Sequence, residues 1–239
     1  MQETQKENLA SSRCYMNPSS EKIMKINHND PPLISTIIPV FNGARYITQA
    51  IESILEQAYP NTEIIVIDDG STDDTAAIVN NIKARVSYYY QDNAGVAAAM
   101  NHGIKKANGD FFSFLDSDDY WLPGKTIRQL EILFQNPELD MVFGHVKQFY
   151  SPELSQEYRQ KYACSETPMP GHNAGCMLIR RTSFFKVGML DEQYEKGAFN
   201  NWYMQSMAIG LRGLMLPDIF YMRRIHDANH GILKRDKYV

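Results

Sequence analysis

Three aspartates fall within four positions in the stretch FLDSDDYW, directly after an apolar run. Asp116 and Asp118 are two residues apart, so both carboxylates can point at one cation, and hard divalent ions prefer carboxylate oxygen together with substrate phosphate. Three acids in one loop repel one another unless a cation or hydrogen-bond donors compensate, and no lysine follows before Lys125. The stretch therefore predicts a divalent-metal site. For Asp119 the alternative is an acid that stabilises the start of the next helix.

A second acidic segment, VIDDGSTDDT, places Asp68 and Asp69 before a Gly-Ser turn. One interpretation is a turn in which Ser71 or Thr72 is the N-cap of the following helix. The functional alternative is a carboxylate that accepts hydrogen bonds from a nucleobase. The two aspartates are adjacent rather than separated by one residue, which argues against a phosphatase-type site.

Both acidic segments follow predicted strands in a regular alternation of strands and helices. The predicted strands are LISTIIPVF, TEIIVIDD, VSYYYQD and DFFSFLD, and each is followed by apolar residues at helical spacing. This alternation predicts a doubly wound, mainly parallel α/β sheet with helices on both faces. Ligands bind outside the carboxyl ends of the strands in such sheets. The polar clusters 39–43, 68–72, 91–95 and 116–119 are therefore expected to line one edge.

The chain after residue 134 contains no repeated unit. It predicts strands at DMVFGHVKQFY and AGCMLIRR around an irregular segment, 151–173, and helices at TSFFKVG and GAFNNWYMQSMAIGLRG. The following LMLPDIFYMRRIH is expected to be extended. We expect one domain over residues 33–239, preceded by a polar, disordered extension over residues 1–32.

Composition excludes several classes of protein. The 239 residues are 44% hydrophobic and 22% charged, and a net charge of -4 gives no reason to expect nucleic-acid binding. No stretch reaches the roughly 18–20 apolar residues of a membrane-spanning helix, and no apolar secretory signal is present, so any membrane contact would be peripheral. Cys14, Cys164 and Cys176 are odd in number and form no CxxC pair. They argue against disulfides and zinc, and indicate the cytoplasm.

Five ordered segments resemble the nucleotide-binding domain of family 2 glycosyltransferases, which have the GT-A fold. They are STIIPVFNGARYITQAIESILEQ, IIVIDDGSTDDT, QDNAGVAAAMNHGI, GDFFSFLDSDDYWLPGK and MLIRRTSFFKVGMLDE. The resemblance covers about residues 33–229. It implies metal-dependent, inverting transfer of a sugar from a nucleoside-diphosphate sugar, and it favours UDP over GDP. It also implies a donor-binding half, about 33–120, and an acceptor-side half, about 121–239. The acceptor, whether glycan, lipid, peptide or small metabolite, is not identified.

The same resemblance implies which residues bind the donor nucleotide. Pro39, Val40 and Phe41 would cradle the base, Asp69 would bind its polar edge, and Asp116 would contact the ribose region.

The resemblance further implies how the diphosphate is held. Asp118 would hold Mn²⁺ or Mg²⁺ against it, and His226, in RRIHDANHG, would help to bind the metal or the diphosphate. Arg223 or Arg224 would add phosphate-directed charge.

The family pattern breaks where it places the general base. Relatives carry a Glu-Asp pair at the start of a late helix, and here the matching residues are Ala198 and Phe199. Three alternatives follow: Glu195 serves from a shifted position, the acceptor or donor phosphate carries the proton, or the chain is a non-catalytic nucleotide-sugar-binding homologue. His172 is a further candidate base, because histidine exchanges protons near neutral pH, with a polar-loop residue as its alternative.

The same acceptor-side region contains three further candidates. Asn173 could contact an acceptor, and Trp202 and Tyr203 could stack on a sugar face or belong to the core.

Overall fold

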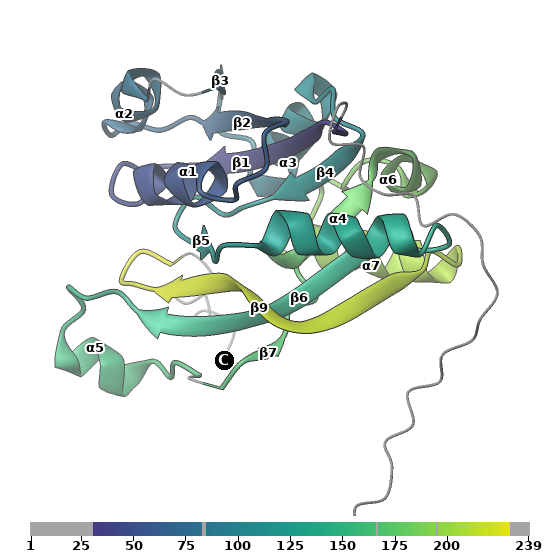
Figure 1. The fold of residues 1–239 in the computed structure, drawn as a ribbon. Coiled ribbons are helices and arrows are strands. Elements are labelled where there is room, and N and C mark those ends of the chain that lie inside the picture. The colour runs from purple at the N-terminus through teal and green to yellow at the C-terminus, as the bar shows by residue number, and fades with distance from the viewer. Residues whose placement is uncertain (1–30, 83–84, 166, 195, 230–239) are drawn as a thin grey trace, which may run out of the picture.

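The computed structural model describes residues 31–82, 85–165, 167–194 and 196–229 (Figure 1). Its strands are β1 (Ile34–Val40), β2 (Thr62–Asp69), β3 (Val86–Gln91), β4 (Phe111–Phe114), β5 (Tyr120–Trp121), β6 (Met141–Tyr150), β7 (Met169–Pro170), β8 (Leu178–Arg180) and β9 (Gly213–Ile225). Its α-helices are α1 (Ile47–Leu55), α2 (Thr75–Asn81), α3 (Val96–Lys106), α4 (Lys125–Gln135), α5 (Gln156–Lys161), α6 (Arg181–Val187) and α7 (Ala198–Ala208). None of the helices in these ranges combines the length and apolar character needed to cross a membrane.

The described strands form one mixed, mostly parallel sheet in the order β3-β2-β1-β4-β8-β6-β9-β5, with β7 paired to β6. Strands β1 to β4 are parallel to their neighbours among themselves. Strand β8 is antiparallel to both β4 and β6, and β9 is parallel to β6. Strands β6 and β9 therefore run in the same direction as β1, and their carboxyl ends reach the same edge of the sheet.

Helices cover both faces of the sheet, as predicted. In Figure 1, α1 and α4 lie in front of the sheet, and α3, α6 and α7 lie behind it. Every residue of β1 and of β4 is buried, as expected for strands covered on both faces. Strand β3, at the edge of the sheet, is only partly buried.

The buried apolar residues form two clusters. In the smaller one, Leu130 and Leu133 of α4 pack with Ile34, Phe111 and other strand residues. The larger cluster contains buried residues of α1 as well as of α3, α6 and α7, so it includes helices from both faces of the sheet. There the ring of Phe184 in α6 stacks on Trp202 in α7, with centroids 4.7 Å apart. Trp202 is thus a core residue and does not stack on a sugar.

Two predicted segments differ from the structure. The segment 151–173 was expected to be irregular but contains α5 and β7. The stretch AGCMLIRR was expected to be a strand throughout, yet Ala174–Cys176 form a 3-10 turn and only Leu178–Arg180 are extended. The Asn173 side chain explains the turn, because its oxygen accepts the Cys176 N–H at 2.9 Å. The Asn173 side-chain oxygen is therefore engaged in local structure, and a contact of this residue with an acceptor stays a prediction.

Candidate nucleotide-sugar site

The predicted polar clusters meet at one edge of the sheet. Asn42, after β1, donates its backbone N–H to Ser71 Oγ at 2.8 Å, and its side-chain oxygen accepts the Thr72 N–H at 2.8 Å. Gly43 approaches the loop after β4 so closely that a Cβ added to it would lie 3.3 Å from the Ser117 hydroxyl. The carboxyl ends of β1, β2 and β4 therefore lie together at one edge of the sheet, as expected.

Asp69 holds the loop that precedes α3. It is buried, its Oδ1 accepts hydrogen bonds from Gln91 Nε2 and the Ala94 N–H at 2.8 Å, and its Oδ2 accepts the Gly95 N–H at 2.9 Å. Three donors occupy most of the acceptor capacity of a carboxylate. Asp69 thus joins the polar cluster 68–72 to the cluster 91–95. Its contact with the polar edge of a base stays a prediction.

The turn after β2 does not cap α2 in the expected way. Helix α2 begins at Thr75 and its N-cap is Asp74, so the prediction that Ser71 or Thr72 is the N-cap is wrong. The segment between β2 and α2 is longer than the sequence suggested. Its first turn is closed by buried Asp68, whose carboxylate accepts the Ser71 N–H at 2.7 Å. Asp68 is thereby fixed as a structural residue.

The three residues predicted to cradle a base differ in exposure. Pro39 and Val40 are buried at the end of β1, whereas the Phe41 side chain is 40% exposed. Phe41 is the one of the three whose side chain is exposed. A flat, exposed aromatic ring beside the polar loops fits a contact with a planar base.

Asp116 lies at the start of the loop after β4. Solvent reaches it, but the protein packed around it still desolvates the carboxyl group, and the negative charge of Asp118 acts in the same direction. Together they raise the pKa of Asp116 to about 6, while the hydroxyl of Tyr221, 3.0 Å from Oδ2, and the charge of Arg223 oppose the rise. A second positive charge at this loop would relieve the repulsion between the two carboxylates.

Asp119 is a structural residue, but its partners are not those of a helix-start acid. Helix α4 begins at Lys125 with Gly124 as its N-cap, so the interpretation of Asp119 as an acid at the helix start is wrong. Asp119 is buried, and it accepts the Arg224 N–H at 2.6 Å and the Tyr221 hydroxyl at 2.5 Å. Burial and the charges of the two other aspartates in the loop hold its pKa well above the usual range. Asp119 fastens the loop to β9.

Asp118 contacts the residues that follow β9. Its Oδ2 is 2.9 Å from His226 Nε2 and 3.1 Å from Asn229 Nδ2. The two residues predicted to bind a metal are thus in direct contact. No group of three His, Cys, Asp or Glu side chains surrounds a common point in the part of the chain that the structure describes. A cation here would need further ligands from a bound substrate, and the role of His226 as a ligand stays a prediction.

The two neighbouring arginines have different surroundings. Arg224 is buried, lies over the rings of Tyr46 and Phe149 at 4.4 and 4.7 Å, donates Nε to the Asp118 carbonyl at 2.9 Å and also bonds to Gln49. Arg223 is exposed, and its charge acts on Asp116. Of the two alternatives in the sequence, only Arg223 has an exposed side chain, and its contact with a phosphate stays a prediction.

Lys125 is a buried residue that links α4 to β4. Its buried Nζ lies 3.9 Å from the centre of the Trp121 ring and donates to Ser113 Oγ at 3.1 Å. Burial lowers its pKa to about 7. This lysine compensates no carboxylate of the loop by direct contact, and it ties α4 to β4.

Helix α7 has an apolar start at the position where the family resemblance predicts a Glu-Asp pair. Helix α7 begins at Ala198, which is buried, and its first turn contains no acidic residue. The Phe199 ring is stacked with Trp202 and Tyr203 at centroid distances of 5.9 and 6.4 Å. Glu195, one candidate base, lies outside the described residues. Aromatic packing thus occupies the position at which a carboxylate was expected.

His172 packs against this aromatic group. Its ring centroid is 5.7 Å from that of Phe143 and 5.6 Å from that of Tyr203, and the residue is exposed. Nothing in these contacts orients the imidazole as a base, because a catalytic histidine is usually fixed by a hydrogen bond to its second nitrogen. Its role as a base stays a prediction.

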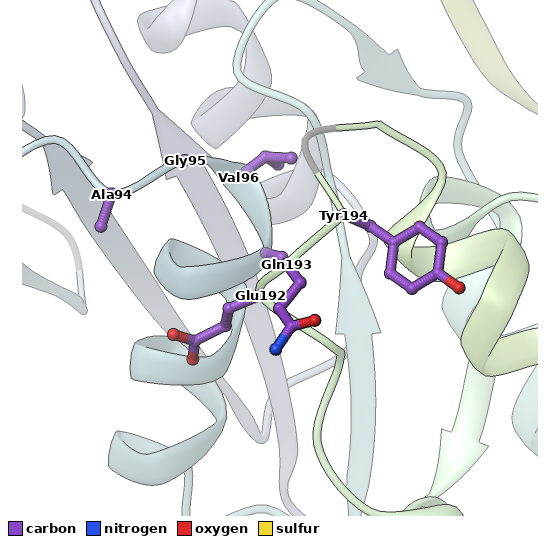
Figure 2. A pocket seen from close by; sticks show the side chains of 7 residues that line it. Ala94, Gly95, Val96, Glu192, Gln193 and Tyr194 are labelled. Carbon is purple, nitrogen blue, oxygen red and sulfur yellow. The ribbon is translucent and has the colours of Figure 1, made fainter.

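A small pocket lies between the start of α3 and the segment before α7. It has a volume of about 180 Å³ and is lined by residues 94–97, at the start of α3, and by Glu192, Gln193 and Tyr194 (Figure 2). Glu192 accepts a hydrogen bond from Asn101 Nδ2 at 2.8 Å, and Asn101 also bonds to both backbone groups of Leu190. The segment before α7 is therefore anchored to α3.

Two residues of the site escaped sequence analysis. Tyr221 bridges Asp116 and Asp119, and Asn229 bonds to Asp118. Tyr221 lies in β9, and the largely apolar sequence around it did not point to a hydroxyl group at the site. The segment RRIHDANHG drew attention to its histidine, and the spacing of three between His226 and Asn229, typical of a closed turn, was the available signal.

Comparison with known proteins identifies the family. The model of glycosyl transferase family 2 matches residues 35–200. The chain belongs to this family. It is 34% identical over 217 residues to an uncharacterized glycosyltransferase of Rickettsia typhi, a match that covers 82% of this chain and 65% of the relative. An uncharacterized glycosyltransferase of Haemophilus influenzae is 49% identical over 118 residues, 48% of this chain and 47% of the relative.

A solved structure supports the fold. The S. aureus TarS fragment 1–349 in complex with UDP-GlcNAc has a TM-score of 0.64 and 22% sequence identity, and the match covers 83% of this chain and 60% of that one. The prediction of a GT-A glycosyltransferase fold is confirmed. The chain spans about two thirds or less of the length of these proteins.

Proposed function

We propose that this chain transfers a sugar from a UDP-sugar to an acceptor, with inversion at the anomeric carbon and with Mn²⁺ or Mg²⁺ as cofactor. The observation that carries the proposal is the loop 116–119, which brings two carboxylates to the carboxyl edge of a family 2 glycosyltransferase sheet and holds Asp118 against the end of β9. TarS, a protein of the same fold, has been solved with UDP-GlcNAc, which supports a UDP-sugar as donor.

The chemistry of the loop fits a divalent cation. The charge of Asp118 helps to raise the pKa of Asp116, so the two carboxylates repel each other and a cation between them and the diphosphate would relieve that repulsion. Asp118 would hold the ion, and diphosphate oxygens would supply further ligands. When bound, such an ion neutralises charge on the departing nucleoside diphosphate. Exposed Arg223 would add positive charge at the same phosphates.

The transfer itself exchanges one bond for another. The acceptor oxygen or nitrogen forms a bond to the anomeric carbon, the bond from that carbon to the diphosphate oxygen breaks, and its electron pair leaves with the nucleoside diphosphate. The acceptor proton must go to a base. His172 and Glu195 are the candidate bases of the chain, with the donor phosphate as the alternative.

A second candidate function follows from α7. Ala198 and Phe199 occupy the positions of the usual carboxylates, and the first turn of the helix is apolar and aromatic. A homologue that binds a nucleotide sugar without transferring it would keep the donor edge and lose this base.

Donor binding is tested by thermal unfolding with UDP and Mn²⁺. Saturation at 100 times the dissociation constant stabilises a protein by about 2.7 kcal/mol, which raises the melting temperature by several degrees. We expect this shift in the wild type and in Asp218→Ala, an exposed acid on β9, and its loss in Asp118→Ala. No shift with any nucleoside diphosphate would rule out both functions.

Turnover then separates the enzyme from the binder. Hydrolysis and transfer are measured across a panel of UDP- and GDP-sugars for the wild type, Glu195→Gln and His172→Ala. Turnover by the wild type supports the transferase, and binding without turnover of any donor supports the second candidate. Full activity in both variants eliminates both side chains as bases.

A further inference from the structure

The side chain of Gln91 connects Asp69 to helix α3. Asp69 and Gln91 are the last residues of β2 and β3, and they are register partners in this parallel pair. Their side chains lie on the same face of the sheet, where Gln91 Nε2 donates to Asp69 Oδ1 at 2.8 Å. The oxygen of the same amide lies 2.9 Å from His102 Nδ1, in α3. Gln91 thus bridges a carboxylate and an imidazole.

The direction of each hydrogen bond in this bridge follows from the carboxylate. A carboxylate only accepts, so the NH₂ group of Gln91 faces Asp69 and the Gln91 oxygen faces His102. Because that oxygen can only accept, His102 Nδ1 donates. A charged imidazole also carries a proton on Nδ1, so the bond forms in both charge states of the ring. The three side chains form a relay in which His102 holds Gln91 and Gln91 holds Asp69.

Close packing of α3 on the sheet determines where His102 lies. A Cβ added to Gly103, the next residue, would clash with Ile37 and lie 3.3 Å from Ile67 Cγ1, so the glycine allows the helix to come this near. Ile67 is two residues before Asp69 in β2, and the two side chains therefore point to the same face. The helix thus holds the imidazole on the face of the sheet that carries the carboxylate.

Three protein donors leave Asp69 with one free acceptor position. Gln91 Nε2 and the Ala94 N–H bond to Oδ1, and the Gly95 N–H bonds to Oδ2. A carboxylate offers about four acceptor positions, so one remains on Oδ2. A base with an N–H on its ring edge, such as uracil, can donate to that position. Cytosine has an unprotonated ring nitrogen at the equivalent place, and two lone pairs would face each other.

We propose that His102 is a positioning residue of the donor site, which acts through Gln91 to hold the Asp69 carboxylate with its free Oδ2 position toward the base, and that this relay strengthens the preference for uracil over cytosine. The inference rests on the proposed function for the presence of a uridine nucleotide. The relay itself consists of protein groups only, so it can also be tested without a nucleotide.

The test without nucleotide is amide hydrogen exchange of the full chain at Ala94 and Gly95, whose N–H groups bond to Asp69. Exchange at Ile65 and Ile67, in the buried part of β2, reports the stability of the sheet. Relative to these two amides, Ala94 and Gly95 should exchange about threefold to tenfold faster in His102→Ala, the range of one net hydrogen bond.

Two further variants complete the exchange experiment. Gln91→Leu removes the bridge itself and should have the same effect as His102→Ala, since both variants free the carboxylate of Asp69 from the relay. His102→Asn keeps a side-chain N–H donor near the position of Nδ1 and should restore slow exchange at Ala94 and Gly95.

The test with nucleotide compares UDP and CDP by calorimetric titration. We expect His102→Ala to weaken UDP binding about threefold to tenfold and to change CDP binding less than about twofold, so that the ratio of the two affinities falls. His102→Asn should stay within about twofold of the wild type for UDP. The matched control is His145→Ala, which removes an imidazole whose Nδ1 donates to the Pro217 carbonyl, and it should bind both nucleotides normally.

Several results would overturn the proposal. They are a wild type that binds CDP as tightly as UDP, equal weakening of both nucleotides in His102→Ala, exchange that accelerates equally at all four amides, and failure of His102→Asn to restore the wild-type values. A wild type that binds no nucleoside diphosphate would instead contradict the proposed function. Exchange at Ala94 and Gly95 would then decide whether the relay positions Asp69.

Discussion

The donor edge and the start of α7 stand in contrast. At the donor edge, the three aspartates of loop 116–119 are held by hydrogen bonds from β9 and from the turn after it. At the start of α7, Ala198 is buried and Phe199 is stacked on aromatic neighbours. The first region is polar and each of its acids is fixed by hydrogen bonds, whereas the second is apolar and packed. The two regions can therefore be varied separately by mutation.

The largest effect is expected from placing carboxylates at the start of α7, which would remove the difference between the two regions. In the double variant Ala198→Glu, Phe199→Asp the rate of UDP-sugar hydrolysis or transfer is expected to rise by roughly 10²-fold or more, the contribution of a well-placed general base. Acids in the first turn of a helix are also electrostatically favourable. Steady-state kinetics with a saturating donor would measure the change.

The control for this variant is Met204→Asp, which places an acid on the exposed side of the same helix and should not alter turnover. Unchanged turnover in the double variant, with donor binding intact, would show that another group already removes the proton.

The next prediction sharpens the division of labour between the two arginines. Arg224→Ala removes a buried guanidinium with several hydrogen bonds and two ring contacts, so the free energy of unfolding should fall by about 2–3 kcal/mol. Arg223→Ala should leave stability unchanged and weaken UDP binding several-fold, more so at low salt. Urea unfolding and calorimetric titration separate the two effects. Equal loss of stability in both variants would refute the assignment of Arg223 to the phosphates.

A smaller effect is expected from buried Lys125. Its folded pKa of about 7 lies below the usual value for lysine, so between about pH 7 and 10.5 the unfolded chain binds a proton that the folded chain does not. Stability should therefore rise with pH in that window, by at most about 1.4 kcal/mol per pH unit, and the attraction of the Trp121 ring for the charged form reduces this slope. Lys125→Met should flatten the rise. Urea unfolding of both proteins at pH 7, 8 and 9 measures the difference, and parallel curves would contradict it.

The smallest effect is predicted for His172. Because its ring contacts Phe143 and Tyr203 and no hydrogen bond from the described residues fixes it, His172→Ala should change turnover less than about threefold. A fall of 100-fold or more with unchanged donor affinity would instead identify His172 as the base. Kinetics at several pH values would show whether such a fall follows the titration of a histidine.

The sequence predicted the parts of the fold that depend on local patterns. Burial on both faces makes β1, β2 and β4 apolar, and motif spacing located Asp116 and Asp118 at the end of β4. The α5 helix was missed because its six residues bury nothing and so show no periodic pattern.

The site was harder to predict where residues distant in the chain meet. Asp119 looked like a helix-start acid because Arg224 and Tyr221, its actual partners, lie more than 100 residues away. Asp69 looked like a ligand contact, and its bonds to the loop before α3 depend on how that loop folds back. The metal, the cytoplasmic location and the base stay predictions.

The attachment of loop 116–119 to the residues after β9 also sets the order in which the molecule can be completed. Strands β1 to β4 and the helices between them all lie within residues 34–114, so they can pair while the rest of the chain is still being synthesised. The carboxylate of Asp118 acquires its fixed orientation only when Asn229 has emerged, 111 residues later. A nascent chain can thus have most of its sheet in place while the loop 116–119 still lacks its final geometry.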